Sequence, residues 1–421
     1  MTTGPPQPGV FCRHAGVCGG CSLLHLSYAE QLASKDAALR SLFAPHLPRE
    51  ARSARSFFTG DSVASSPPFD GSPGPGQATV ADPERFRQKA AFVFAPGPDG
   101  RGLTMGHFAR GSQRVVAIEE CPVHSERANR IAFALRDRLL AAGIGAAGGR
   151  GRAAVLRHLI VRTTADDREA VAMLVVTRND KALRRPIRAL LESRDRPDGL
   201  FININDEPGP FMVGETTIRI DGIRHVRERV GGVSFLVSPA AFFQTNVRAA
   251  GVLQGIVVRS VSGAERVLDL YCGSGLLTLP LALAGARVTG VEENAQAIRD
   301  ANANAALNRV PEGRVRFVAG RVDHVLPRLR ASSWDAVVLD PPRQGCGSAV
   351  IDAVFAGLAP PRVTYVSCNP EALRDELPAI EAAGYRLAAL RAVDMFPHTD
   401  HVEAIAQFRP SGGARTSREA S

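Results

Sequence analysis

Short runs of apolar residues, each followed by a stretch with helical spacing, repeat through the last third of the chain. The apolar runs are residues 267–271, 287–291, 315–318, 336–339 and 363–366. Two more, residues 386–395 and 403–408, follow each other directly and predict an antiparallel pair at a sheet edge. Strand–helix alternation at this spacing predicts a doubly wound, mostly parallel α/β sheet with right-handed crossovers.

The preceding part of the chain has longer strand patterns and fewer helical ones. Amphipathic spacing predicts helices over residues 27–43, 127–142 and 181–193, and a long helix that ends near residue 261. Strands are predicted over residues 86–94, 104–118, 155–163, 170–177, 200–205, 216–220 and 233–237. These elements predict one α+β domain over residues 84–237.

Segments with few apolar residues separate the predicted domains. Residues 59–83 are rich in Ser, Pro and Gly and predict a flexible insertion. The first ten residues and the tail 411–421 have the composition of disordered ends. We therefore expect an N-terminal cysteine-containing segment over residues 1–58, the α+β domain over 84–237 and the α/β domain over 238–410.

Composition and charge narrow the class of protein. Of 421 residues, 45% are hydrophobic and 22% charged, which is typical of globular proteins. No stretch approaches the roughly 18 uncharged apolar residues of a membrane span, and the N-terminus lacks the basic-then-apolar order of a signal peptide. We expect a cytoplasmic protein without a membrane partner.

The positive charge is concentrated in one part of the chain. Residues 85–162 contain 14 Lys and Arg against 5 Asp and Glu, a surplus equal to the net charge of +9 of the whole chain. A localised basic surface favours a polyanionic partner, most simply a nucleic acid. An arginine-rich composition with a solvated face explains the same count equally well.

Three cysteines lie within ten residues near the N-terminus. Cys12, Cys18 and Cys21 form a C-x5-C-x2-C pattern, and Cys121, followed by a proline, is the candidate for a fourth ligand. In a reducing compartment such cysteines more often bind metal than form disulfides. Four thiolates suit an iron–sulfur cluster or zinc, and the spacing does not choose between them. Unliganded thiols are the alternative.

Another cysteine stands at the end of a predicted strand. Cys368 follows the apolar run 363–366 and precedes Asn369 and Pro370. A residue before proline is pushed away from helical geometry, so we expect a turn at Asn369. The cysteine would then be displayed at the carboxyl edge of the sheet, where ligands bind in open α/β folds. A buried core cysteine is the alternative interpretation.

The first strand of the α/β domain ends in a glycine-rich loop. Asp269 precedes Gly273 and Gly275 in an Asp-x-x-x-Gly-x-Gly pattern, which resembles the first motif of class I S-adenosylmethionine-dependent methyltransferases. Glu292 ends the second strand, where a carboxylate can accept both ribose hydroxyls of an adenosine. A helix-capping acid is the alternative for Glu292.

The fourth strand ends in Asp340-Pro341-Pro342-Arg343. Asp-Pro-Pro also occurs in enzymes that methylate exocyclic amines of bases, where an aromatic residue after the second proline stacks on the base. Arg343 occupies that position here, which argues against the interpretation that the protein methylates an exocyclic amine.

A cysteine at the carboxyl edge of the sheet could act as the nucleophile in methylation of carbon 5 of uracil. That carbon is a poor nucleophile until a thiolate adds to carbon 6, and a base must afterwards remove the proton from carbon 5. We expect Cys368 as the nucleophile and Glu403, at the start of the last strand, as the base. His398 and His401 are competing candidates, each better suited to a structural or substrate-contacting role.

Several motifs together identify a family. Phe242-Phe243-Gln244-Thr245-Asn246, the Asp269 loop, Asp340-Pro341-Pro342-Arg343, Ser367-Cys368-Asn369-Pro370 and residues 394–403 are similar to the RNA uracil-5-methyltransferase family, over residues 12–408 without the insertion. The resemblance implies that Cys368 is the nucleophile and Glu403 the base. It implies that Gln244, Tyr271, Glu292 and Asp340 bind S-adenosylmethionine with the Asp269 loop. It also implies that Cys12, Cys18, Cys21 and Cys121 hold a [4Fe-4S] cluster.

The cysteine cluster, and the lack of a recognisable β-barrel RNA-binding module before Cys12, resemble the RlmC branch, which methylates a hairpin-loop uridine of 23S ribosomal RNA. We therefore expect 23S ribosomal RNA as the partner, with tRNA as the alternative, and a base turned out of its stack to reach Cys368. A non-catalytic RNA-binding protein is the rival of another class, but the nucleophile, base and cofactor loop are all intact. Without a heptad pattern we expect a monomer.

Overall fold

The computed structural model describes residues 10–47, 56–58, 83–97, 99–150, 153–207, 212–330 and 332–412. The predicted insertion, apart from residue 83, and most of the predicted disordered ends lie outside the described residues. Contacts group the chain into two compact units. The first contains Met1–Tyr28, Asp82–Arg229 and Phe235–Arg248, and the second contains Ala29–Ala81, Val230–Ser234 and Ala249–Ser421. The domain boundaries drawn from composition stay predictions beside this grouping.

In its described part, the first unit holds an eight-stranded sheet with the order β3-β2-β1-β5-β6-β7-β8 and β4 beside β5. The strands are β1 (Lys89–Ala95), β2 (Thr104–Phe108), β3 (Val115–Ala117), β4 (Gly145–Ala146), β5 (Ala154–Thr163), β6 (Ala170–Val176), β7 (Gly199–Ile204) and β8 (Thr216–Gly222). The helices are α3 (Glu126–Ala141), η1 (Lys181–Leu183) and α4 (Arg184–Leu191). Every residue of β6 is buried, and β5 and β6 share one apolar core with α3.

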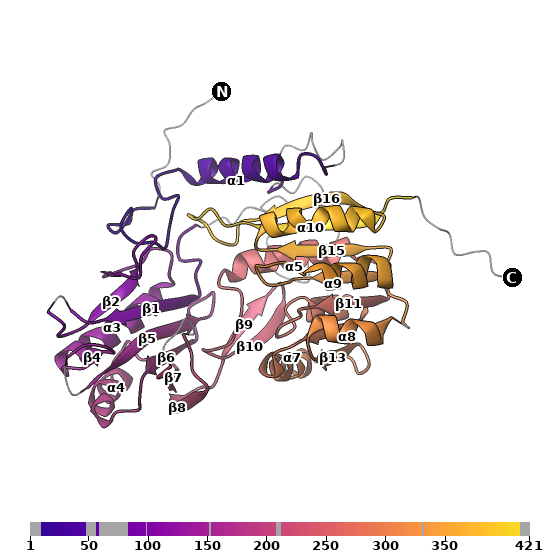
Figure 1. Ribbon diagram of the computed structural model, residues 1–421. Coiled ribbons are helices and arrows are strands. Elements are labelled where there is room, and N and C mark those ends of the chain that lie inside the picture. The colour runs from indigo at the N-terminus through magenta and orange to yellow at the C-terminus, as the bar shows by residue number, and fades with distance from the viewer. Residues whose placement is uncertain are drawn as a thin grey trace. The chain divides into compact units, whose positions relative to one another are not determined.

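The second unit contains the doubly wound sheet that strand–helix alternation predicts (Figure 1). Its described strands run in the order β13-β12-β11-β14-β15-β17-β16. They are β11 (Arg266–Leu270), β12 (Arg287–Glu292), β13 (Val315–Ala319), β14 (Ala336–Leu339), β15 (Val363–Ser367), β16 (Tyr385–Val393) and β17 (Glu403–Pro410). The first five pair in parallel, and β17 is antiparallel to both β15 and β16, so the predicted edge pair is confirmed.

The helices around this sheet alternate with its parallel strands in sequence. They are α5 (Val247–Ser260), α6 (Thr278–Leu283), α7 (Ala295–Leu307), α8 (Val322–Leu329), α9 (Ser348–Ile351) continued by η2 (Asp352–Leu358), and α10 (Pro370–Ala382). A separate pair of strands, β9 (Val226–Val230) and β10 (Val233–Val237), precedes α5. The sequence analysis missed β9, whose residues alternate between apolar and charged over only five positions.

Helix α1 (Tyr28–Phe43), predicted over residues 27–43, belongs to the second unit from Ala29 onward. Its buried residues Leu39 and Phe43 lie in the same core as the sheet residues Tyr365 and Phe408. Figure 1 shows α1 along the side of the sheet where β16 stands. The N-terminal segment therefore contributes a layer to the second unit, which the composition of residues 1–58 does not indicate.

Two elements of the first unit differ in their bounds from the expectation. The strand expected over residues 86–94 begins at Lys89, because Arg87 instead forms isolated bridges with His124 and Asn246. Burial lowers the pKa of Lys89 to about 8, and the Nε atom of Arg87 is buried. The helix expected over residues 181–193 is shorter, since η1 forms its first turn and α4 ends at Leu191.

Candidate active site

Five neighbouring strands bring the predicted chemical residues to one edge of the second unit's sheet. In the order β12-β11-β14-β15-β17, the carboxyl ends of four parallel strands carry Glu292, Tyr271, Asp340 and Cys368. Strand β17 runs the opposite way and begins at that edge with Glu403. The shared edge follows from strand direction alone, because parallel strands end on the same side.

Cys368 and Glu403 stand at matching ends of adjacent strands. Ser367 pairs with Ala404, so the next position on each strand is Cys368 and Glu403. Glu403 is 3% exposed, whereas Cys368 is half-buried. The cysteine thiol is therefore more accessible than the carboxyl group beside it.

The electrostatics of this edge favour protonated carboxyl groups. Burial, and then the neighbouring Asp340, raise the pKa of Glu403 to about 8, while Arg343 acts to lower it. Burial also raises the pKa of Asp340 to about 7. The pKa of the Cys368 thiol is raised by burial and then by Glu403 and Asp340, again against the effect of Arg343. Arg343 thus favours the charged forms of both Cys368 and Glu403.

The turn after Cys368 is short and firmly held. The Ser367 hydroxyl donates to the carbonyl of Asn369 (2.8 Å) and accepts from its backbone N–H (3.2 Å). Asn369 has extended geometry, as expected before a proline, but α10 begins at once with Pro370 at its first position, where a missing N–H is tolerated. The Asn369 amide donates to the carbonyl of Arg343 (3.0 Å), which links the Cys368 turn to the Asp340 loop.

The glycine-rich loop after β11 is compact and open on one side. Tyr271, Gly273 and Gly275 all have positive φ angles. The Glu292 carboxylate accepts from the backbone N–H of Gly273 (3.1 Å) and of Asn294 (2.8 Å), so it does cap the turn before α7. A Cβ atom added to Gly273 would meet no atom within 4 Å, so the loop borders open space there.

Asp269 lies beneath this loop and is completely buried. One carboxylate oxygen accepts a hydrogen bond from the hydroxyl of Thr278, and the other has no partner among the described residues. Burial raises the pKa of Asp269 to about 7, and Asp340 and Glu292 act in the same direction. Asp269 therefore ties the loop to the start of α6.

Glu376 on α10 supports the Asp340 loop, a role that the sequence analysis missed. Its carboxylate accepts from the Tyr365 hydroxyl on β15 (2.7 Å) and from the backbone N–H of Gly347 (2.8 Å). A Cβ on Gly345 would lie 2.6 Å from the same carboxylate, so only glycine fits there without a shift of the Glu376 side chain. A lone glutamate on a helix gives no sequence signal of such a contact.

The two histidines before Glu403 differ in environment. His401 is exposed, and both of its ring nitrogens lie 3.2 Å from a guanidinium nitrogen of Arg343. His398 is buried with a positive φ angle, and its Nδ1 lies 3.1 Å from the amide nitrogen of Gln31. Burial favours the structural role for His398 and leaves Glu403 as the candidate base.

The four candidate metal ligands, Cys12, Cys18, Cys21 and Cys121, all belong to the first unit, and all are half-buried. Burial raises the pKa of Cys21 to about 12, with further increases from Cys121, Cys18 and Cys12, so the four sulfurs lie within electrostatic range of one another. Close approach at Gly19 allows this fold, because a Cβ there would lie 2.9 Å from the carbonyl of Phe108. Within the described ranges, however, no three His, Cys, Asp or Glu side chains already form a metal-binding group.

Gln244 lies in the first unit, whereas the other predicted cofactor residues belong to the second. Its neighbours Phe242 and Phe243 differ in exposure. Phe243 is buried and its ring centroid lies 5.4 Å from that of Phe235, whereas Phe242 is 85% exposed.

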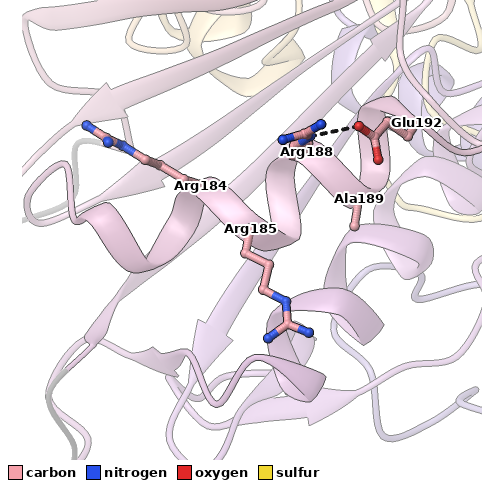
Figure 2. Close-up of a pocket in the computed structure, with 5 residues that line it drawn as sticks. All are labelled: Arg184, Arg185, Arg188, Ala189 and Glu192. Carbon is pink, nitrogen blue, oxygen red and sulfur yellow. Dashed lines mark hydrogen bonds and ion pairs between the residues drawn. The ribbon is translucent and has the colours of Figure 1, made fainter.

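A surface pocket of about 490 Å³ lies on α4, outside the basic segment 85–162. Figure 2 shows Arg184, Arg185 and Arg188 pointing in different directions from the helix, with Arg188 paired to Glu192 (2.8 Å). None of the predicted site residues lines this pocket. Its exposed arginines are suited to contacts with an anion.

No helix in the described part of the chain combines the length and the apolar character that a membrane crossing requires.

Known proteins similar to this chain are RNA methyltransferases. Residues 225–408 match the family described as tRNA (uracil-5-)-methyltransferase. An uncharacterized RNA methyltransferase of Gloeobacter violaceus is 31% identical over 406 residues, which cover 95% of this chain and 82% of that protein. One of Thermosynechococcus vestitus is 32% identical, with coverage of 95% and 84%.

A solved structure resembles the chain over nearly its whole length. It is the Pyrococcus abyssi tRNA (uracil-54, C5)-methyltransferase in complex with S-adenosyl-L-homocysteine, with a TM-score of 0.72, 26% identity and coverage of 93% of this chain and 84% of that one. The chain belongs to the S-adenosylmethionine-dependent RNA uracil-5-methyltransferase family.

Proposed function

We propose that this enzyme methylates carbon 5 of a uridine in 23S ribosomal RNA through a covalent adduct with Cys368. The observation that carries the mechanism is the placement of Cys368 and Glu403 at matching ends of β15 and β17, with Arg343 acting on both. A nucleophile and a base on adjacent strands can act on neighbouring atoms of one pyrimidine ring.

In the first step the Cys368 thiolate adds to carbon 6, and the electrons of the carbon 5–carbon 6 double bond move onto the ring as an enolate. Carbon 5 then attacks an electrophilic methyl group, which S-adenosylmethionine would supply when bound. The electron pair of the broken sulfur–methyl bond would stay on the cofactor's sulfur, so that S-adenosylhomocysteine would leave. The charge of Arg343 favours the thiolate over the thiol. Cys368 thereby converts an unreactive carbon into a nucleophile.

In the second step Glu403 removes the proton from carbon 5. That electron pair re-forms the carbon 5–carbon 6 double bond, and the Cys368 sulfur leaves carbon 6 as a thiolate with the electrons of the broken bond. The raised pKa of Glu403 matches a base that must accept a proton near neutral pH.

Seven residues are proposed to bind S-adenosylmethionine. These are Gln244, Asp269, Tyr271, Gly273, Gly275, Glu292 and Asp340. The open space beside Gly273 and the unpartnered buried oxygen of Asp269 fit a ligand at the glycine-rich loop. The carboxylate of Glu292, at the end of β12, is the candidate acceptor for the ribose hydroxyls.

We propose that Cys12, Cys18, Cys21 and Cys121 hold a [4Fe-4S] cluster. Four half-buried thiols within electrostatic range of one another fit a tetrathiolate group. Burial raises the pKa of Cys18, Cys21 and Cys121, and the charge of Arg87 acts against this increase. The methyl transfer requires no electron exchange, so the role proposed for the cluster is to stabilise the first unit. Its cysteines tie residues 12–21 to the segment that follows β3.

The first unit is the proposed RNA-binding part. It exposes three aromatic side chains, Phe11, Phe108 and Phe242, which can stack on unpaired bases. It also carries the basic segment 85–162 and the arginines of α4, which can contact phosphates. We propose that the enzyme acts in the cytoplasm as a monomer, and a molecular mass that rises with protein concentration would contradict the monomer.

A uridine in tRNA is the second candidate target. The matching family is described as tRNA (uracil-5-)-methyltransferase, and the similar Pyrococcus structure is a tRNA enzyme. The resemblance of the cysteine cluster to the ribosomal branch favours 23S ribosomal RNA instead.

Mass mapping of 5-methyluridine in a deletion strain and its parent tests both targets. We expect the loss of one 5-methyluridine from 23S ribosomal RNA, restored by the wild-type gene but not by a Cys368→Ala variant. Loss from tRNA alone would select the second candidate. Unchanged 5-methyluridine in both RNAs would contradict the proposed function.

A further inference from the structure

Helix α1 buries two polar side chains of types that normally face water. Gln31 is 1% exposed and Lys35 is 4% exposed, although both lie on a helix whose positions 33, 34, 37 and 38 are open to solvent. A buried polar side chain is stabilising only where its hydrogen bonds are made, so the partners of these two residues indicate their role.

Gln31 holds His398 at two points. Its side-chain oxygen accepts from the backbone N–H of His398 (2.9 Å), which leaves its amide N–H to donate to Nδ1 of the His398 ring (3.1 Å). Nδ1 must then be the unprotonated ring nitrogen. His398 has a φ angle of 65°, an unfavourable conformation for a residue with a side chain, and the two contacts with Gln31 hold it there.

Lys35 holds the beginning of the same loop. Its ammonium group donates to the carboxylate of Asp394 (2.7 Å) and to the carbonyl of Phe396 (3.2 Å). Gln31 and Lys35 are one helical turn apart, so one face of α1 contacts both Asp394 and His398. The helix therefore binds this connection at two positions.

The loop held by α1 determines where Glu403 stands. Residues 394–402 connect β16 to β17, and the last residue of β16, Val393, pairs with Glu403. Five positions separate His398 from Glu403. On the other side His401 meets Arg343, so the loop is held between α1 and the Asp340 loop.

Helix α1 is itself anchored to the sheet. Asp36 accepts hydrogen bonds from the hydroxyl of Ser56 (2.9 Å) and the backbone N–H of Phe57 (2.6 Å). The carbonyl of Phe57 accepts in turn from the backbone N–H of Ala392 on β16 (3.0 Å). The helix cannot shift along β16 without breaking these contacts.

We propose that α1 is a positioning element for the base: Gln31 and Lys35 fix the loop 394–402 so that the Glu403 carboxylate reaches the proton on carbon 5. The inference rests on the proposed function of Glu403. It predicts a defect in one step only. Formation of the Cys368 adduct and methyl uptake do not require the base, whereas proton removal and release of the cysteine do.

The experiment follows the two steps separately in a single turnover. RNA from a deletion strain, labelled with tritium at carbon 5 of its uridines, is mixed with excess enzyme and S-adenosylmethionine carrying a ¹⁴C-methyl group. Methyl incorporation reports the first step, and tritium released to water reports the second. In the wild type we expect equal rates of the two signals.

For Gln31→Ala we expect methyl incorporation within about twofold of wild type and tritium release slowed by at least about tenfold, because a misplacement of about 1 Å costs a catalytic group a large factor. A methylated protein–RNA species that resists denaturant should accumulate. Gln31→Glu, which keeps an acceptor for the His398 N–H, should recover part of the release rate.

Two variants on the same helix serve as controls. Ser34→Ala, at an exposed position, should behave as wild type. Leu39→Ala should lower the melting temperature by removing core packing while the ratio of the two rates stays at the wild-type value. Equal slowing of both signals in Gln31→Ala, or no slowing, would overturn the positioning role. Absence of tritium release by the wild type would instead refute the proposed function.

Discussion

Lys35 and Asp394 form an ion pair with 2.7 Å between Nζ and Oδ1, and both side chains are almost completely buried. The two residues are 359 positions apart in sequence, one on α1 and the other at the end of β16. Burial lowers the pKa of Lys35, and Asp394 acts against that effect. The pair therefore gives each of two buried polar groups a partner.

Loss of Lys35 should strongly destabilise the second unit. Lys35→Met leaves the Asp394 carboxylate buried without its cation, and we expect a loss of about 3–5 kcal/mol in the free energy of unfolding, measured with urea. The double variant Lys35→Met/Asp394→Leu should recover most of that loss. A single-variant effect below about 1 kcal/mol, typical of a surface pair, would contradict the buried pair.

Substitutions of Cys368 and of Glu403 should block different steps of the methylation reaction. Cys368→Ala should give neither methylated uridine nor a covalent protein–RNA species, because no adduct can form. Glu403→Gln should form the methylated adduct but release it slowly, with turnover reduced by about 10²–10⁴-fold. Denaturing gels with radiolabelled RNA distinguish the two. Methylation of an exocyclic amine by Cys368→Ala would revive the amine-directed alternative.

Activity should rise with pH through the titration of Glu403. The base must be a carboxylate to accept the proton, and its pKa is about 8, so kcat/KM should increase as the pH rises through 8. The Cys368 thiol, whose pKa burial raises above its ordinary value, must also ionise, so a further increase is expected at higher pH. Asp340→Asn removes a negative neighbour of Glu403 and should lower the pKa of Glu403. The rise in kcat/KM should then occur at lower pH, whatever the effect of the substitution on the maximal rate. If kcat/KM rises at the same pH in Asp340→Asn as in wild type, Glu403 is not the base that this titration reports.

Ionisation of Glu403 should raise activity but lower the stability of the folded protein as the pH rises. Because folding raises the pKa of Glu403 from 4.5 to about 8, its contribution to stability is complete below pH 4.5 and is lost as the pH rises through 8. In urea unfolding, the stability of Glu403→Gln should therefore fall less than that of wild type as the pH rises from 4.5 to about 8.

The arginines of α4 should contribute to RNA affinity through charge. Arg184 and Arg185 are exposed, and Arg188 is paired with Glu192. Arg184→Ala/Arg185→Ala should weaken binding of single-stranded RNA and reduce the slope of log affinity against log salt by about 1.4, or 0.7 for each lost phosphate contact. Arg188→Ala is the matched control with a smaller expected effect. An unchanged slope in the double variant would exclude this surface from the RNA interface.

The metal content of the first unit should follow its four cysteines. Protein purified without oxygen should contain iron and sulfide in equal amounts and absorb visible light. Cys21→Ser should lose the absorbance, whereas Cys346→Ser, outside the four-cysteine set, should retain it. Stoichiometric zinc without iron would show that the four thiolates hold zinc instead.

Local patterns in the sequence predicted most of the second unit. Its seven strands lie within two residues of their predicted ends, because β-branched apolar runs and helical spacing are properties of neighbouring residues. The edge location of Cys368, Asp340 and Glu292 followed from parallel strand direction, which the alternation of elements already implies. The same patterns are weaker in the first unit, where β9 was missed and the strand at residues 86–94 began late.

The sequence by itself determined the family, the sheet, and the identities of the candidate nucleophile, base and cofactor loop. Only the tertiary structure decided which polar side chains meet: Gln31 with His398, Lys35 with Asp394, and Glu376 with Tyr365. It also exposed Phe242 and buried the Nε atom of Arg87. The physical reason is that secondary structure depends on residues a few positions apart. Burial and the pKa shifts that follow from it depend on contacts across the fold, some of them between segments hundreds of positions apart.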